Sequence, residues 1–220
     1  MALEAFAAAL SRPRPGQARD DSTLVTQRLF AVADGADLGA GAGGQALAQL
    51  QRLLGPYPTA RNLAQALNAV NFALWQRDDG AGALRSTITA GVLLGSRVAI
   101  GHVGDSRAYL LRGHRVYRLT PDDRAPNSYR SDDGVPRLGH RPPEATPHVR
   151  RYLLHHRDRL ILCTDGLWRG VTERELVLTG GLAPAAACTL LCGRALADED
   201  ASLVVVDFSE VGPAGPGLGP

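Results

Sequence analysis

Three runs of apolar, strand-like residues in this chain each end on an aspartate that lies next to a glycine. They cover residues 29–35, 98–105 and 160–166, and a fourth acid, Asp200, precedes a last apolar run over 202–208. If the fold brings these strand ends together, the carboxylates form a cage of oxygen ligands suited to hard divalent cations such as Mg²⁺ or Mn²⁺. The feature therefore constrains the fold and is the basis for a prediction of function.

Asp-Gly is also typical of tight turns, because glycine adopts positive φ and aspartate bonds the nearby backbone. A two-residue hairpin requires a second alternating strand directly after the turn. After Gly35 the chain instead continues into a glycine-rich run over 36–44 and a helical pattern, and after Gly166 it continues into residues 167–170 and a helix-like segment. Neither Asp-Gly pair fits a hairpin.

Length and composition favour one domain that is large enough for a substantial core. The chain has 220 residues with 45% hydrophobic content, and we expect a single domain over 13–210, a flexible or short helical N-terminus over 1–12 and a disordered Gly/Pro tail over 211–220. All 24 basic residues are arginine, and 22 acids reduce the net charge to +2. That balance argues against a nucleic-acid-binding face.

No apolar stretch approaches the roughly 20 residues of a membrane span, and the first residues lack the positive region of a secretory signal. We therefore expect a soluble, cytoplasmic protein without a membrane partner. Cys163, Cys188 and Cys192 have neither CxxC spacing nor a nearby ligating histidine, so buried free thiols are expected rather than disulfides or a zinc site.

Hydrophobic periodicity predicts the order of the elements. Leu63, Leu67, Val70 and Leu74 lie on one face of a helix, and Gly95-Ser96 suits a type II′ hairpin within an antiparallel meander. Strands are expected at about 22–33, 86–94, 97–103, 107–111, 115–119, 148–154, 159–164 and 202–208, helices at about 42–54, 60–77, 172–179 and 183–197, and an irregular segment over 121–147. This order describes sheet layers with helices outside, an α+β sandwich.

Several motifs occur together and in one order along the chain. They are Phe-Ala-Val-Ala-Asp-Gly over 30–35, Ala-Gly-Gly over 42–44, Ser-Thr-Ile-Thr over 86–89, His-Val-Gly-Asp-Ser-Arg-Ala-Tyr over 102–109, Leu-Thr at 119–120, Leu-Ile-Leu-Cys-Thr-Asp-Gly-Leu-Trp over 160–168, then Asp200 and Val-Val-Val-Asp over 204–207. The chain thereby resembles the metal-dependent type 2C protein phosphatases, the PPM family, in their short bacterial form. The resemblance runs from about residue 20 to 208.

The resemblance implies an αββα sandwich of two antiparallel β-sheets flanked by helices, with two Mn²⁺ or Mg²⁺ ions in a cleft at one end. It implies a hydrolase that removes phosphate from phosphoserine or phosphothreonine of a protein, without a phosphoenzyme. Two cations about 3.5–4 Å apart lower the pKa of a bridging water and clamp the oxygens of an in-line displacement. The implied partners are a phosphorylated protein substrate and a bacterial serine/threonine kinase or its targets, and we expect a monomer.

The resemblance also assigns metal ligands. Asp34 would bridge both ions, and Gly35 would bind through its carbonyl. Asp165 and Asp200 would bind the first metal. Asp105 corresponds to the carboxylate that can take a third, weakly bound metal.

The N-terminal part of the site departs from the family pattern. The acid pair is Asp20-Asp21 after Arg19, where the family has Glu-Asp after Asn, and Asp20 would lie near the second metal. The phosphate-binding arginine normally stands four residues before this pair, where the chain has Gly16. Arg14 and Arg19 are both candidates to replace it, and the choice stays open, with Arg19 taken beside Asp34 as a catalytic residue.

Two further departures concern the loops. Ala36 stands where some family members place a histidine, and Ala201 replaces the asparagine of the final Asp-Asn pair. These changes support an alternative in which the chain is a weakly active or inactive regulatory module. Against it, the four acids at strand ends are all present, and unpaired buried carboxylates are costly unless a cation binds them.

A nucleotide-binding protein is the remaining alternative, because the glycines over 39–44 fit GxGxxG. However, no acid occurs between Leu38 and Arg77 to hold a ribose, and the absence of lysine excludes a Walker lysine. The metal-dependent phosphatase is the interpretation that accounts for all four acids.

Overall fold

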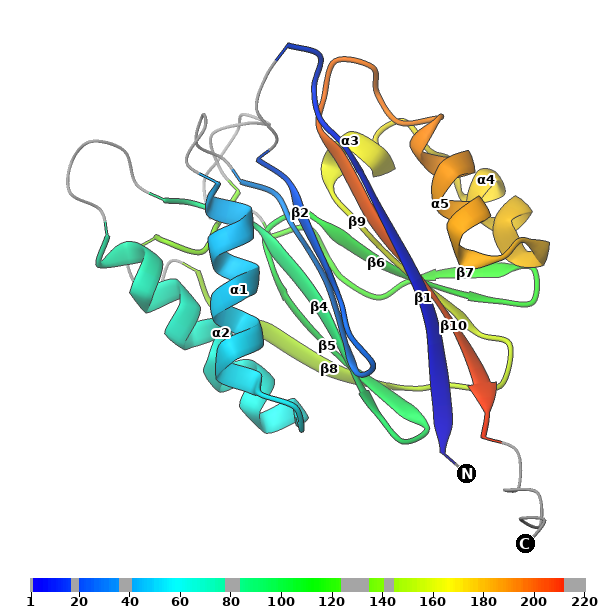
Figure 1. Ribbon diagram of the computed structural model, residues 1–220, viewed down its shortest axis with the longest axis horizontal. Coiled ribbons are helices and arrows are strands. Elements are labelled where there is room, and N and C mark those ends of the chain that lie inside the picture. The colour runs from blue at the N-terminus through cyan, green and yellow to red at the C-terminus, as the bar shows by residue number, and fades with distance from the viewer. Residues whose placement is uncertain are drawn as a thin grey trace, which may run out of the picture.

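The computed structural model describes residues 2–16, 20–35, 41–77, 84–123, 135–140 and 145–211. These residues form two five-stranded sheets that pack face to face, with helices on both outer sides (Figure 1). The layers follow the order helix, sheet, sheet, helix. This arrangement confirms the predicted αββα sandwich.

Every neighbouring pair of strands in both sheets is antiparallel. Sheet A has the order β1 (Leu3–Arg12), β10 (Ala201–Glu210), β9 (Arg159–Cys163), β6 (Arg107–Arg112) and β7 (Arg115–Arg118). Sheet B has the order β2 (Ser22–Val25), β3 (Leu29–Ala33), β4 (Ile88–Leu94), β5 (Arg97–Val103) and β8 (His148–Leu153). The four edge strands are therefore β1, β7, β2 and β8.

The helices form the two outer layers. Helices α1 (Ala42–Leu54) and α2 (Ala60–Trp75) cover sheet B, and α5 (Pro184–Cys192) packs on β1 and β10 of sheet A. The short elements α3 (Asp165–Trp168), α4 (Glu173–Leu178) and the 3₁₀ turn Thr179–Gly181 complete the layer over sheet A. Among the described residues, no helix combines the length and hydropathy needed to span a bilayer.

Alternation along the strands divides the core into three layers. Leu29, Ala31 and Ala33 of β3 pack toward α1 and α2, while Phe30 and Val32 between them pack between the sheets. A third layer lies between sheet A and α3–α5. Since β3 is buried on both faces, its end is held rigidly, and Asp34 follows directly.

The local signals in the sequence account for several elements. Helix α1 has the predicted bounds, and α2 begins after Thr59, whose side chain accepts a hydrogen bond from the Asn62 N–H at 3.1 Å. Gly95 has φ 63° in the turn between β4 and β5. Helix α5 ends at Cys192 rather than at about 197, because Gly193 caps it. The three cysteines are free and buried, as expected.

The expectation for the N-terminus was wrong. Residues 1–12 were predicted to be flexible or a short helix, but Leu3–Arg12 form β1, which pairs with β10 along its whole length. Alanine has the highest helix propensity, and the run Ala-Phe-Ala-Ala-Ala-Leu gives no strand signal by itself. Pairing with a buried neighbouring strand overrides that local preference.

The strands predicted to form one antiparallel meander are divided between the two sheets. The chain leaves sheet B after β5, crosses in residues 104–106 and enters sheet A at β6. It crosses back to sheet B at β8 and again to sheet A at β9. Apolar alternation within a strand shows that one face is buried but not against which sheet, so the sequence alone could not assign these strands to their sheets.

Candidate metal centre

Three of the predicted acids come together at one end of the sandwich. Asp34 follows β3, Asp105 lies in the crossing between β5 and β6, and Asp165 is the first residue of α3 after β9. One carboxylate oxygen from each lies within 4.8 Å of the other two. These acids are far apart in the sequence and come from both sheets, so the fold itself assembles the cluster.

The acids of the N-terminal segment and of β10 lie beside this cluster. Asp21 is buried, and its Oδ2 accepts a hydrogen bond from Thr164 Oγ1 at 2.7 Å. The Asp200 carboxylate accepts the main-chain N–H of Arg14 and, at 3.2 Å, that of Asp20. Asp200 therefore holds the segment that carries Asp20 and Asp21 against the site.

Mutual repulsion and burial dominate the electrostatics of these acids. Burial, followed by the charges of Asp21 and Asp165, raises the pKa of Asp34 well above its ordinary value. Burial raises the pKa of Asp21 to about 6, against the lowering effect of the Thr164 hydroxyl. Burial and the charge of Asp165 raise the pKa of Asp105 to about 6. The side chains of the described residues do not fully compensate these charges.

The donor set fits divalent cations. Asp21 Oδ1 and Asp105 Oδ1 are buried, and no donor in the described part of the chain gives either of them a hydrogen bond. Carboxylate oxygens in this density are the ligands that Mg²⁺ and Mn²⁺ prefer. A cation would supply the missing partner and offset the repulsion, so the residues present fit the predicted metals.

Glycines beside the acids permit the close approach of the segments. A Cβ on Gly166 would lie 2.0 Å from the Asp200 carbonyl oxygen, and a Cβ on Gly43 would lie 2.6 Å from that of Asp20. Gly35 is similarly close, at 3.0 Å from the same Asp20 oxygen. The Asp-Gly pairs are therefore packing sites where backbone meets backbone, rather than hairpin turns.

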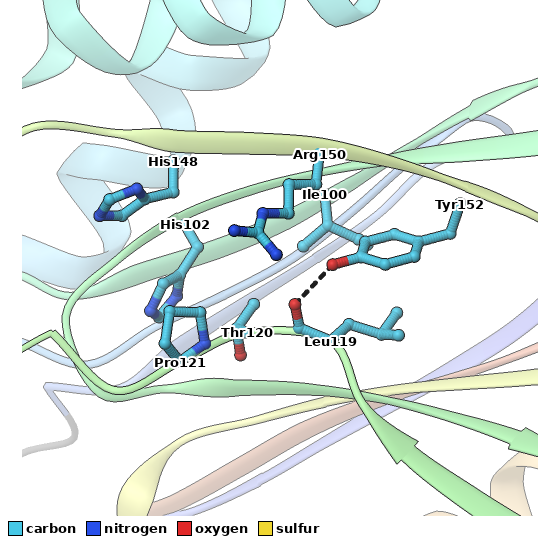
Figure 2. Close-up of a pocket in the computed structure, with 8 residues that line it drawn as sticks. All are labelled: Ile100, His102, Leu119, Thr120, Pro121, His148, Arg150 and Tyr152. Carbon is cyan, nitrogen blue, oxygen red and sulfur yellow. Dashed lines mark hydrogen bonds between the residues drawn. The ribbon is translucent and has the colours of Figure 1, made fainter.

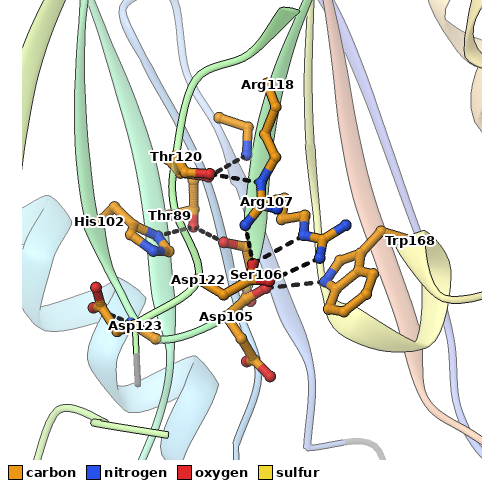
Figure 3. A network of polar contacts seen from close by, with 12 residues as sticks. Thr89, His102, Asp105, Ser106, Arg107, Arg118, Thr120, Asp122, Asp123 and Trp168 are labelled. Atoms are coloured by element: carbon orange, nitrogen blue, oxygen red, sulfur yellow. Dashed lines mark hydrogen bonds and ion pairs between the residues drawn. The ribbon is translucent and has the colours of Figure 1, made fainter. Parts of the chain in front are cut away.

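Hydroxyl groups fix the backbone behind the cluster. The Asp34 N–H donates to Thr87 Oγ1 at 3.2 Å, and Thr87 shares a hydrogen bond of 2.7 Å with Ser106 Oγ. Thr89 Oγ1 donates to the Ser106 carbonyl at 3.0 Å (Figure 3). Thr87 and Thr89, directly before and within β4, thus hold Asp34 and the crossing that carries Asp105 in one frame.

The crossing is held from its other side by an aromatic and ionic contact. Trp168 Nε1–H donates to the Asp105 carbonyl at 2.9 Å, and the Arg107 guanidinium lies 3.3 Å from the centre of the Trp168 ring. Arg107 also binds Asp122 through two hydrogen bonds of 2.9 and 2.8 Å (Figure 3). The position of Asp105 therefore depends on Trp168 of α3, against which Arg107 of β6 packs.

A small cavity of about 30 Å³ lies between β8 and the segment after β7 (Figure 2). Thr89 donates its hydroxyl proton to Ser106, so His102 Nδ1 carries the proton shared with Thr89 at 2.9 Å, and burial lowers the pKa of His102. His102 Nε2, facing this cavity, has no partner among the described residues. The volume suits a water molecule and is too small for a larger ligand.

The sequence analysis did not identify the arginine side chains that lie nearest to the acids. Arg169 pairs with Asp165 at 3.0 Å and with Glu199 at 3.3 Å, and the charge of Arg137 lowers the pKa of Asp105. Arg169 stands one residue after the recognised Asp-Gly-Leu-Trp motif, at helical i,i+4 spacing from Asp165, which was an available signal. Thr164, Thr87 and Ser106 lie within the recognised motifs, but the sequence analysis gave none of them a role of its own.

Other predicted positions lie outside the described residues. Arg19, Ala36 and residues 212–220 belong to this group, and so do parts of the glycine-rich run and of the irregular segment. Arg14, the other candidate for phosphate binding, is exposed and contributes its main-chain N–H to Asp200. Ala201 is fully buried in the layer beneath α5, where an apolar side chain packs well.

No model of a protein family matches the chain. Among curated proteins it is similar to the serine/threonine protein phosphatase PstP of Mycobacterium tuberculosis, with 29% identity over 183 residues, covering 72% of this chain and 35% of the relative. The chain thus spans about a third of the length of that protein. Among solved structures, the catalytic domain of PstP in complex with two manganese ions superposes with a TM-score of 0.81 and 26% identity, over 94% of this chain and 100% of that one.

The chain is therefore similar in sequence and in fold to serine/threonine phosphatases of the PPM type. Two further structures share its fold. The PPM Ser-Thr phosphatase MsPP of Mycobacterium smegmatis, in complex with cacodylate, has a TM-score of 0.80 at 23% identity over 92% of this chain and 97% of that one. PppA of Pseudomonas aeruginosa has a TM-score of 0.81 at 20% identity over 93% and 97% of the two chains. The recognition made from the motifs is confirmed.

Proposed function

We propose that this PPM chain is a metal-dependent protein serine/threonine phosphatase that hydrolyses phosphoserine and phosphothreonine. The observation that carries the proposal is the cluster of Asp34, Asp105 and Asp165, whose carboxylate oxygens converge within 4.8 Å of one another. Among the described residues, Arg169 pairs with Asp165. Relatives described as serine/threonine phosphatases, one of them with two manganese ions, support it.

Asp34 and Asp165 would hold the ions, with Asp20, Asp21, Asp200, the Gly35 carbonyl and, for a third ion, Asp105. When bound, two such ions activate water and stabilise the charge that develops in phosphoryl transfer. The protein's own part is to hold these acids in place from both sheets and to exclude alternative arrangements. The Thr87 and Trp168 contacts do this for Asp34 and Asp105.

Arginine side chains near the acid cluster would orient the substrate. Arg169 already faces Asp165, and Arg137 acts on Asp105 through its charge. Arg19 remains our candidate for binding the phosphate group, since it directly precedes the acid pair. We further propose that the substrate is a protein phosphorylated by a bacterial serine/threonine kinase, and that the protein acts in the cytoplasm.

A manganese titration tests the proposal. Wild-type protein should hydrolyse an aryl phosphate and a phosphothreonine peptide in proportion to bound Mn²⁺. Changing a residue that only supports metal ligands typically costs about 10–100-fold in activity. Asp34→Asn and Asp165→Asn change proposed ligands themselves, so each should reduce kcat/KM by more than this and leave the circular dichroism spectrum unchanged. Glu210→Gln, an exposed acid at the far end of β10, serves as the matched control and should keep full activity.

The result would favour the alternative of an inactive regulatory module if wild-type protein showed no turnover at saturating Mn²⁺ on several phosphopeptides. Equal activity of Asp34→Asn and wild type would contradict the metal centre itself.

A further inference from the structure

One edge of the sandwich lacks the protection that the other three edges have. Exposed edge strands invite pairing with another chain, and proteins usually shorten them or place charges on them. Strands β2 and β7 have four residues each, and β7 begins and ends with arginine. Strand β8 carries His148, Arg150 and Arg151. Strand β1 has ten residues without proline, glycine or a break in its register, and its charges stand only near its two ends.

The free edge of β1 can be identified from its hydrogen bonds. The Val211 N–H donates to the Ala2 carbonyl at 3.2 Å, so Ala2 faces β10, whereas the Leu3 N–H donates away from β10, to the Gly95 carbonyl at 3.3 Å. In an antiparallel ladder this direction alternates along the strand. The main-chain groups of Ala5, Ala7, Ala9 and Ser11 therefore point outward, where the described structure contains no neighbouring strand.

Two even-numbered residues in the middle part of the strand, Phe6 and Leu10, also have exposed side chains. Phe6 is 52% exposed and Leu10 37% exposed, although both lie within a strand. Glu4 forms no ion pair with the described residues, and the Arg12 guanidinium donates only to main-chain carbonyls, those of Cys192 and Leu196, among its hydrogen bonds in the described structure. A partner for this edge should therefore present an exposed edge strand of its own. That strand should have apolar side chains in its middle, and at its ends charges opposite to those of Glu4 and Arg12.

We propose that the partner is a second copy of this chain, joined antiparallel along β1 about a two-fold axis at Ala8. In this register Glu4 lies opposite the second copy's Arg12, Phe6 opposite its Leu10, and Ala8 opposite its Ala8. The outward residues then meet each other, Ala5 with Ser11 and Ala7 with Ala9, and exchange main-chain hydrogen bonds.

The register is self-consistent because a two-fold interface requires that residue i contacts j while j contacts i. It pairs outward main-chain groups only with outward ones, as the antiparallel pattern demands. It also places both charge pairs and both aromatic–aliphatic pairs directly across from each other, where such pairs stabilise a sheet. The two A sheets would form one continuous sheet of two copies, independent of the proposed catalytic function.

This proposal departs from the monomer expected on the sequence alone, where strand β1 was not predicted. Light scattering and sedimentation velocity of the 220-residue chain should show a concentration-dependent mass approaching twice 23.3 kDa. Ala9→Pro should raise the dissociation constant about tenfold or more, because proline removes an outward N–H without affecting the bonds to β10. Glu4→Arg should do the same by placing like charges opposite each other, and Glu173→Arg on α4 is the matched charge control.

The register itself is tested by cross-linking. The double variant Phe6→Cys with Leu10→Cys should form a covalent dimer under mild oxidation, because the two positions face each other across the axis at about 4.5–5.5 Å between Cβ atoms. Phe6→Cys alone should not. A wild-type protein that stays monomeric up to its solubility limit would overturn the proposal, and so would undiminished dimerisation of Glu4→Arg and of folded Ala9→Pro.

Discussion

The carboxylates at the end of the sandwich repel one another, and contacts with neighbouring side chains offset this repulsion only in part. Thr164 donates to Asp21 and Arg169 pairs with Asp165, yet burial and neighbouring charges still raise the pKa of Asp21 and of Asp105 to about 6. At neutral pH without cations, these groups are ionised at a cost to the folded state. The cost has a measurable dependence on pH.

We predict that the metal-free protein loses stability as the pH rises from about 5 to about 7. A raised folded-state pKa means that the folded chain binds more protons than the unfolded chain in this window, so the free energy of unfolding falls as pH rises. Asp122, whose pKa its arginine partners lower, is already ionised in both states there. His102, whose pKa burial lowers, contributes in the opposite direction, but it stands against the raised pKa values of Asp21, Asp34 and Asp105 together. Thermal unfolding in a chelator should show a falling midpoint.

Added Mn²⁺ should flatten or reverse the slope, because the ionised carboxylates are the ligands. Asp34→Asn removes the charge at the centre of the cluster and should reduce the slope in the chelator. A midpoint that rises with pH in metal-free protein would contradict the assignment of these acids as uncompensated.

At the scale of elements, the site depends on backbone segments that touch. The chain crosses from sheet B to sheet A at Gly104, which has φ 108° and whose N–H donates to Asp123 at 2.9 Å. A Cβ there would lie 2.7 Å from the Thr87 side chain. The start of α3 is equally tight against the residue before β10. Small residues at these contacts therefore determine whether the acids converge.

We predict that Gly166→Ala destabilises the fold by about 3 kcal/mol, the upper part of the range for forced overpacking. The added Cβ would lie 2.0 Å from the Asp200 carbonyl oxygen, so α3 and the start of β10 must separate. Urea unfolding measures the loss, and the Mn²⁺ concentration for half-maximal activity should rise as well. Gly193→Ala, at the end of α5 with no contact closer than 3.5 Å, is the matched control and should be nearly neutral.

Local sequence signals predicted the elements whose formation depends on local chemistry. The 4-3-4 spacing of leucines and valine in α2 and the Gly95 turn are examples, and both formed as expected. Strand β1 was missed because its residues favour a helix when isolated, and only pairing with β10 makes it a strand. Similarly, the strand-end acids were visible as candidates, but the Thr164 and Arg169 contacts depend on tertiary packing that no short motif encodes.

At the scale of the whole molecule, the first strand is part of the structural core and not an appendage. Strand β1 covers the outer side of β10, its Ala8 packs against the layer under α5, and Arg12 binds the carbonyls at the end of that helix. Asp200, directly before β10, in turn accepts hydrogen bonds from the main chain of Arg14 and Asp20 and so holds that segment in place. The N-terminus therefore contributes to both stability and the site.

We predict that deletion of residues 2–12 abolishes stable folding. The loss of a full strand ladder, at about 0.5–1.5 kcal/mol per hydrogen bond, together with uncovered apolar surface, approaches the about 5–15 kcal/mol that holds a typical domain together. Circular dichroism and protease resistance of the truncated chain measure the effect. A truncated protein that remains folded and binds Mn²⁺ like the full chain would show that β1 is dispensable.

The crossings of the chain between sheets place the candidate ligands on both halves of the sandwich. Asp21 and Asp34 flank strands of sheet B, Asp165 and Asp200 flank strands of sheet A, and Asp105 lies on the connection between them. An ion bound among them would act as a crosslink between the two halves, so that neither could open at this end without releasing it. Bound metal should therefore slow unfolding as well as stabilise the native state, and chelation should make this end of the sandwich the first to admit a protease.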